Sequence, residues 1–214
     1  MDVKATSDLR VPFRRDRKIP VWMKLGYAAA VPAIGVVYWY AYGPQNYLWL
    51  SDIALVLTAL AVILGNRLLA SMPAVGVLPL EIAWAVDFLA GGNTTGMAAY
   101  MFDGELPLYL RALSGFHLAL PPTLIYLLWK LGYDRRAFAL QTLVTWAALA
   151  AAYAWSDREE NINWVFGPAN EPQQIVPPLV YLGLEMVVIP LVIMLPTHFV
   201  LMRLFGRQSG QSDH

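Results

Sequence analysis

Six long apolar stretches alternate with short polar segments along the chain. They run over about 21–42, 46–70, 73–91, 106–131, 137–155 and 175–203. A helix needs about 20 such residues to cross about 30 Å of hydrocarbon. Backbone groups in hydrocarbon must be satisfied internally, and none of the stretches alternates like a strand of a membrane barrel. The pattern therefore predicts an all-α, polytopic integral membrane protein with six transmembrane helices.

Composition supports this class. Of the 214 residues, 58% are hydrophobic and 14% are charged, and the mean hydropathy is +0.49. A soluble domain carries about 25% charged residues, and one of this composition would expose large apolar patches. The chain has no cysteine, which excludes disulfides, thiolate metal sites and a cysteine nucleophile.

The basic residues predict the orientation. Of the 15 lysines and arginines, 13 fall on one side of the predicted membrane, and the exceptions are Arg111 and Arg158. Such a bias places both termini in the cytoplasm. We expect a basic cytoplasmic arm over 1–20, a transmembrane domain over 21–203 and a cytoplasmic tail over 204–214. The arm either lies on anionic lipid headgroups or acts only as a topogenic signal.

Location and partners follow from this topology. We expect a multi-pass protein of a bacterial inner membrane, with membrane lipids as partners and no nucleic-acid partner. A homo-oligomer is left open by the sequence.

Polar residues inside the apolar stretches are the candidate functional positions, because ionisable groups in hydrocarbon are costly unless paired or hydrated. Most fall in the predicted outer half, which indicates a pocket that opens outward. On one stretch, Arg111, Ser114 and His117 share a broad helical face. The candidates are Ser51, Asp52, Glu81, Asp87, Arg111, Ser114, His117 and Glu185.

Structural roles are an alternative for each of these residues. Arg111 would neutralise Asp52 or Asp87 if it paired with either of them. Asp52 would also serve as a helix cap at the interface, and Glu185 would be held protonated by a hydrogen bond to a neighbouring helix. A single buried histidine such as His117 is commonly a hydrogen-bonded structural residue.

Four segments carry a resemblance to a known family. NYLWLSDIALVLTALAVI (46–63) resembles the second helix of the YwaF-type integral membrane family, which bears a leucine–cysteine–aspartate signature. LSGFHLAL (113–120) resembles its histidine-bearing helix, and NINWVFG (161–167) resembles its asparagine–tryptophan–glycine loop. PPLVYLGLEMVVIPLVIMLP (177–196) resembles its last helix. The likeness covers most of the chain from Asn46 onward, in the same order.

The resemblance implies acyl chemistry. An animal member of that family transfers a fatty acyl chain between phospholipids, and a distantly similar six-helix family hydrolyses fatty-acid esters. By this resemblance Ser51 stands at the nucleophile position, where the family has cysteine, and His117 is the general base. A serine needs such a base. Glu81 or Asp87 would orient the imidazole. The candidates for stabilising an oxyanion are Arg111, Asn161 and Asn163.

The sequence thus predicts an intramembrane serine/histidine acyl hydrolase or acyltransferase that acts on lipid esters from the outer side. The alternative is a transporter or ligand-binding membrane protein with carboxylates as proton or cation sites, namely Asp52, Glu81, Asp87 and Glu185. A metal hydrolase is disfavoured because only one histidine is well placed, and haem is disfavoured because it lacks a second ligand at matching depth. We therefore expect no metal and no cofactor.

Depth is the main difficulty for the enzyme hypothesis. At about 1.5 Å per residue from the predicted helix starts, Ser51 lies about 6 Å and His117 about 16 Å below the surface. A rhomboid-type protease is excluded, because Ala112 replaces the first glycine of that family's GxSG motif and His198 lies at the wrong depth.

Overall fold

The computed structural model describes residues 18–168 and 172–206, and the described part is all-α. Most of the predicted basic arm and of the predicted tail lies outside these residues. The elements in chain order are α1 (Val21–Tyr42), η1 (Pro44–Leu48), α2 (Leu50–Leu64), α3 (Arg67–Leu89), η2 (Ala99–Phe102), α4 (Leu108–Ser114), α5 (Phe116–Leu131), α6 (Ala137–Trp155), η3 (Ile162–Trp164), α7 (Pro178–Val188), the π-helical η4 (Ile189–Met194) and α8 (Leu195–Phe205).

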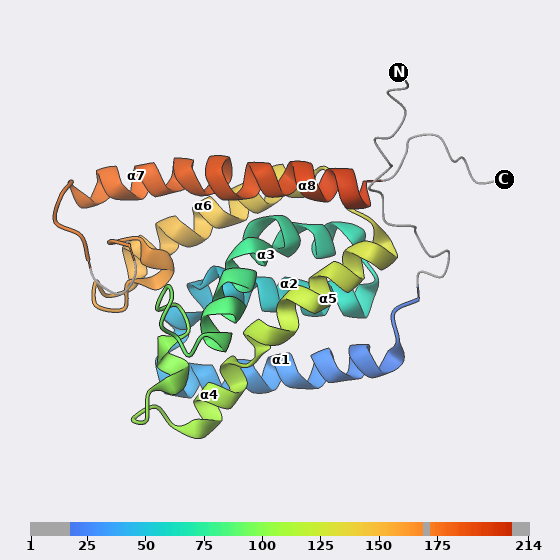
Figure 1. The fold of residues 1–214 in the computed structure, drawn as a ribbon, viewed down its shortest axis with the longest axis horizontal. Helices are drawn as coiled ribbons and strands as arrows, with labels where there is room; N and C mark the ends of the chain where they lie inside the picture. The colour runs from blue at the N-terminus through green and yellow to red at the C-terminus, as the bar shows by residue number, and fades with distance from the viewer. Residues whose placement is uncertain (1–17, 169–171, 207–214) are drawn as a thin grey trace, which may run out of the picture.

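Five helical segments of the described part are long and apolar enough to cross a membrane. They are α1, α3, α4 with α5, α6, and α7 through α8. The remaining predicted span is the second one, and it corresponds to α2, which is apolar but has only 15 residues. Figure 1 shows α7 to α8 along one side of the bundle and α1 along the opposite side, with α2 and α3 between them. The described part is therefore all-α, with the helix lengths and apolar composition that a multi-pass membrane protein has.

The boundary between the second and third spans differs from the prediction. We expected the second span to reach residue 70 and the third to begin at residue 73, but α2 ends at Leu64 and α3 begins at Arg67. Gly65 adopts a left-handed conformation that ends α2, and the Asn66 side chain accepts from the backbone N–H of Leu69 to start α3. The apolar run continues through this turn, so hydropathy alone did not reveal it.

The helices define two ends of the bundle. The basic end holds the start of α1, the α2–α3 turn, the α5–α6 loop and the end of α8. Lys24 of α1 donates to the carbonyl of Ile63, Arg67 contacts Asp134, and Tyr133 N–H donates to the Phe205 carbonyl. The opposite end, which we call the cavity end, holds the α1–α2, α3–α4 and α6–α7 connections. The first and last described helices therefore start and finish at the same end.

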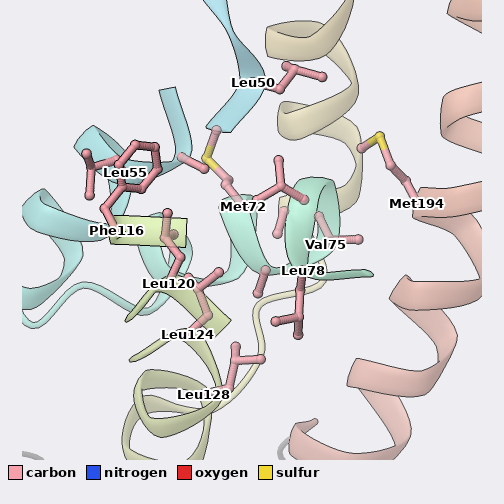
Figure 2. Packing of buried hydrophobic residues seen from close by; sticks show 14 of the residues in the cluster. Leu50, Leu55, Met72, Val75, Leu78, Phe116, Leu120, Leu124, Leu128 and Met194 are labelled. Atoms are coloured by element: carbon pink, nitrogen blue, oxygen red, sulfur yellow. The ribbon is translucent and has the colours of Figure 1, made fainter. Parts of the chain in front are cut away.

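α3 is the central helix of the core. Figure 2 shows Leu120, Leu124 and Leu128 in a row along α5, beside residues of α3 such as Val75. Every one of these side chains is fully or almost fully buried. On another face of α3, a Cβ atom at Gly76 would lie 2.7 Å from the Gln141 side chain of α6. The glycine therefore permits close approach of α6, and tight packing fixes the positions of the helices that carry the cavity.

Two helical breaks adjoin the cavity. Gly115 separates α4 from α5, so the predicted single helix changes direction directly before His117. In the last span, Pro190 cannot donate to the carbonyl one turn before it, which belongs to Met186. The indole N–H of Trp146 on α6 donates to that carbonyl at 2.7 Å. The break is thus compensated by α6, and the π-helical turn is tied to the bundle.

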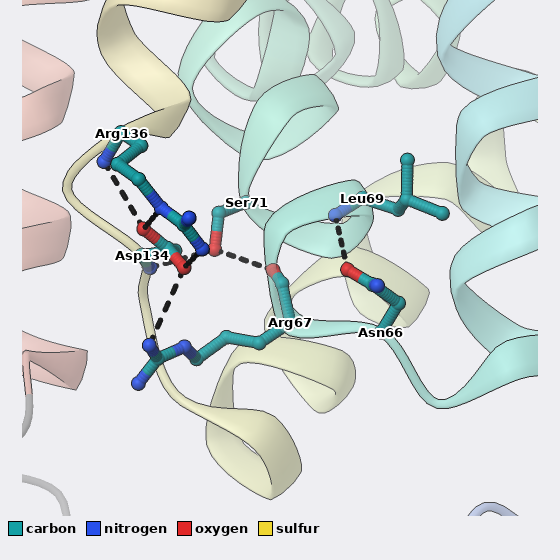
Figure 3. A network of polar contacts seen from close by, with 6 residues as sticks. All are labelled: Asn66, Arg67, Leu69, Ser71, Asp134 and Arg136. Atoms are coloured by element: carbon teal, nitrogen blue, oxygen red, sulfur yellow. Dashed lines mark hydrogen bonds and ion pairs between the residues drawn. The ribbon is translucent and has the colours of Figure 1, made fainter.

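The basic end is held by a polar network around Asp134 (Figure 3). The Asp134 carboxylate accepts from Arg67 and from the side chain and backbone N–H of Arg136, at 3.0–3.3 Å. Ser71 accepts from the Asp134 backbone N–H and donates to the Arg67 carbonyl. Hydrogen bonds from Arg136 and the two guanidinium charges lower the pKa of Asp134 to about 2. Each polar group of this network has a partner.

Candidate active-site cavity

A cavity of about 910 Å³ occupies the cavity end of the bundle. Residues of α1, α2, α3, α5 and α7 line it, together with residues of η3 and the η1–α2 junction. Its walls are mostly apolar and aromatic, with a small set of polar groups, as in sites for amphiphilic ligands. Of the ten candidate residues named from the sequence, seven line it: Ser51, Asp52, Glu81, Ser114, His117, Asn163 and Glu185.

His117 and Glu81 form a hydrogen-bonded pair in the cavity wall. His117 Nδ1 lies 2.8 Å from Glu81 Oε2, and only 4% of the Glu81 side chain is exposed. The imidazole is stacked between Trp84, at 4.6 Å, and Phe116, at 4.1 Å between ring centroids. Glu81 and Trp84 are three residues apart on α3, so one helical face supplies both contacts. The pair fixes the orientation of the ring.

Counted from the basic end, Ser51, His117 and Glu81 lie at similar distances along their helices. Ser51 lies 13 residues before the end of α2, His117 lies 14 before the end of α5, and Glu81 lies 14 after the start of α3. At about 1.5 Å per residue, all three lie about 20 Å from the basic end. The count from the predicted helix starts gives a different result because η1 precedes α2 and Gly115 interrupts the fourth span.

Ser51 lies in the first turn of α2 and is half-buried at the cavity wall. Among the described contacts, no hydrogen bond joins Ser51 to His117. Catalytic hydrogen bonds are often long in the absence of substrate and tighten when it binds. Both side chains line the same cavity.

Asp52 is a second buried carboxylate at the same wall, with 8% of the residue exposed. Its carboxylate accepts a long 3.4 Å hydrogen bond from the Asn46 side chain. It lies near enough to Glu81 for the two carboxylates to interact electrostatically. Asp52 lies in the first turn of α2, as an interfacial cap would, but no ion pair joins it to Arg111 among the described residues.

A hydroxyl cluster beside the histidine joins Ser114, a candidate from the sequence, to Tyr38 and Tyr100, which the sequence did not single out. Ser114 Oγ and the Tyr38 hydroxyl lie 2.8 Å apart, and both residues are buried. Tyr100 of η2 also lines the cavity. Burial raises the pKa of the Tyr100 hydroxyl, while a hydrogen bond with Ser114 acts in the opposite sense. The partners are 76 residues apart in sequence, and only the shared face of Ser114 and His117 pointed toward the cluster.

Asp87 has a structural role rather than the orienting role considered for it. Its carboxylate accepts from the backbone N–H groups of Thr94, Thr95 and Ala98 and from the Thr94 hydroxyl, at 2.6–2.8 Å. It is fully buried beneath the loop that follows α3 and is absent from the cavity lining. Of the two carboxylates proposed to orient His117, Glu81 makes the contact.

The three oxyanion candidates are largely engaged elsewhere. Arg111 donates to the Met101 carbonyl at 3.3 Å and does not line the cavity. Asn161 bonds within its own loop, to Gly167 and Phe166. Asn163 lines the cavity, but its amide oxygen accepts from Leu50 N–H and its amide nitrogen donates to the Leu48 carbonyl. Asn161 thus fixes the shape of the α6–α7 loop, and Asn163 holds this loop on the start of α2.

Glu185 lies on the far wall of the cavity, on α7. Its Oε2 atom is buried and has no hydrogen-bond partner among the described residues. The predicted hydrogen bond to a neighbouring helix is therefore not made by this oxygen. An unpaired buried carboxylate oxygen is costly, and such groups are usual where a ligand or ion binds.

Fold and cavity together describe an all-α protein with several helices apolar enough to span a membrane and, at one end, a mostly apolar pocket that carries a few polar groups. No family model, no curated protein and no solved structure matches the chain. Among the described residues, no group of three or more histidines and carboxylates could hold a metal ion.

Proposed function

We propose that the protein is an intramembrane serine/histidine acyl hydrolase or acyltransferase that acts on lipid esters. The observation that carries this proposal is the 2.8 Å contact of His117 Nδ1 with Glu81 in a cavity that Ser51 also lines. A carboxylate on Nδ1 fixes the tautomer in which Nε2 is free to accept a proton. The apolar and aromatic walls suit an acyl chain.

In the proposed reaction, Ser51 Oγ attacks the ester carbonyl while His117 Nε2 takes the hydroxyl proton. The imidazolium, stabilised by Glu81, then gives this proton to the departing alkoxide. Water, or the hydroxyl of an acceptor lipid, attacks the acyl-serine in the second half-reaction, with His117 again acting as base. The same residues therefore serve hydrolysis and transfer, and the acceptor decides between them.

The start of α2 supplies a source of oxyanion stabilisation that the side-chain candidates lack. The first N–H groups of a helix have no partner within the helix, and the helix dipole is positive at this end. Leu50 N–H is used by Asn163, whereas Ser51 and Asp52 follow it in the first turn. We assign the Asp52 backbone N–H, directly after the nucleophile, to the developing negative charge.

The orientation belongs to the same proposal. Lys24, Arg67, Lys130 and Arg136 lie toward the basic end, as the positive-inside rule requires of a cytoplasmic side. The basic end is then cytoplasmic, both termini are inside, and the cavity faces the outer side of a bacterial inner membrane. The resemblance of four segments to the YwaF-type family supports the same function, with serine in place of the family's cysteine.

The test is labelling of the purified, detergent-solubilised protein with a fluorophosphonate probe. Wild type is expected to be labelled, and Ser51→Ala and His117→Ala are expected to lose the signal. Ser114→Ala, which removes a different serine from the same cavity, is the matched control and should retain it. Wild type that is folded and unlabelled, or labelling that survives in Ser51→Ala, would overturn the proposal.

A second candidate function rests on Glu185. A carboxylate oxygen without a partner in a cavity is also the form of a proton or cation site in a transporter. That function predicts that Glu185→Gln abolishes ion-coupled uptake into vesicles and that Ser51→Ala leaves it intact. The Ser51 and Glu185 variants together therefore separate the two functions.

A further inference from the structure

The cavity is acidic. No lysine or arginine among the described residues lines it. Four carboxylates do, namely Asp52, Glu81, Glu160 and Glu185. Glu81 is paired with His117, and Glu160 accepts from Gln45 at 3.0 Å. Asp52 has only the long contact with Asn46, and Glu185 Oε2 has no partner. The cavity therefore holds more carboxylates than its own residues pair.

Half-buried aromatic rings surround the same space. Tyr42 of α1, Trp49 at the start of α2, Trp164 of η3 and Tyr181 of α7 all line it. Tyr181 lies one helical turn before Glu185, near enough for the two side chains to interact electrostatically. Aromatic faces combined with a carboxylate are the usual recognition elements for organic ammonium groups.

The position of Trp164 is set by a strained loop. Trp164 has a backbone φ of 65°, in the left-handed region that bulky residues rarely adopt, and Asn161 and Asn163 are also positive. The buried hydrogen bonds of the two asparagines hold this conformation. Backbone strain of this kind is found mainly at ligand sites, where the surrounding contacts hold the unfavourable conformation in place.

We propose that the cavity recognises an amphiphile whose polar group is an organic ammonium and which carries no phosphate or sulfate. Glu185 and Tyr181 contact the ammonium, with Trp164 and Trp49 around it, and the alkyl chain lies along the apolar wall. An anionic group is disfavoured because four carboxylates face it. This inference names the substrate class of the cavity and rests on the proposed function only for the reaction that follows binding.

The test is isothermal titration of the protein in dodecyl maltoside with hexyltrimethylammonium, and with hexanesulfonate as the anion of equal chain length. Saturable binding of the cation alone is expected. Glu185→Gln should weaken it about tenfold or more, since one charge contact is lost. Glu159→Gln, an exposed residue of the loop before η3 that does not line the cavity, is the control and should bind as wild type does.

Equal binding of cation and anion, or unchanged affinity in a folded Glu185→Gln protein, would overturn the inference. Fluorophosphonate labelling of wild type, with Ser51→Ala as the negative control, distinguishes failure of this inference from failure of the proposed function. Cation binding without any labelling would support the ammonium site and contradict the proposed enzyme. Labelling without cation binding would support the enzyme and contradict the ammonium site.

Discussion

The two ends of the bundle use the same residue types in opposite ways. At the basic end, Asp134 is enclosed by Arg67 and Arg136, and His198 Nδ1 lies 2.7 Å from the Tyr133 hydroxyl. At the cavity end, His117 has a carboxylate on one nitrogen, and its ring borders an open space. A buried polar group that is fully satisfied stabilises a fold, whereas one left facing a cavity is available for chemistry.

The largest contrast is expected between the two histidines. His117→Ala should lower the rate of fluorophosphonate labelling by about 10²–10⁴-fold, the usual contribution of a general base. His198→Ala, at the basic end, should leave that rate unchanged within about twofold. Pseudo-first-order labelling rates of both variants, measured beside wild type, provide the comparison. A slow His198→Ala protein that is correctly folded would contradict the separation of the two ends.

A smaller effect, on stability alone, is expected from Asp134→Ala. Removing this carboxylate leaves two guanidinium groups and the Ser71 network without their acceptor, at a cost of roughly 2 kcal/mol in unfolding free energy. The midpoint of thermal unfolding in detergent should fall, while labelling of the folded fraction stays as in wild type. Loss of labelling in a fully folded variant would show that the basic end contributes to the site.

Asp87 tests whether the cavity end also contains purely structural carboxylates. Asp87→Ala removes four hydrogen bonds that fix the loop after α3, so the melting temperature should fall by several degrees. Limited proteolysis should cut within residues 90–98 earlier than in wild type. Because Asp87 does not line the cavity, binding of hexyltrimethylammonium should change by less than about twofold, in contrast with Glu185→Gln.

The smallest effect is the pH dependence of the basic end. The pKa of Asp134 is about 2, below its ordinary value of 3.8, so its ionised form is stabilised by folding. This stabilisation is present above about pH 4 and is lost as the pH falls through 2, and it amounts to at most about 2 kcal/mol. Unfolding free energies of wild type and Asp134→Asn should therefore converge between pH 4 and pH 2. Parallel curves over this window would contradict the assignment.

Hydropathy predicted the elements better than their connections. The first and fifth spans match α1 and α6, because each is bounded by proline, glycine or polar residues. The α2–α3 boundary was wrong by several residues, since the apolar run continues past Gly65 and Asn66. This glycine–asparagine pair was the only local signal, and it marks a left-handed residue followed by a helix cap.

The cavity was predictable in its residue types but not in its pairings. The rarity of polar groups in apolar spans led to Ser51, Glu81, His117 and Glu185, all of which line it. Helical spacing could not decide between Glu81 and Asp87 as partner of His117, because that depends on how α3 packs against α5. The Tyr38–Ser114 contact depends on packing in the same way.

The short α2 also bears on how the chain enters a membrane. At 15 residues it extends about 22 Å, less than the about 30 Å of hydrocarbon that an independently inserted helix must cross. Only Gly65 and Asn66 separate it from α3, which is long enough. During biosynthesis the two helices would therefore leave the translocation machinery as one hairpin. Ser51, Asp52 and Glu81 would then enter the lipid together, before α5 brings the histidine.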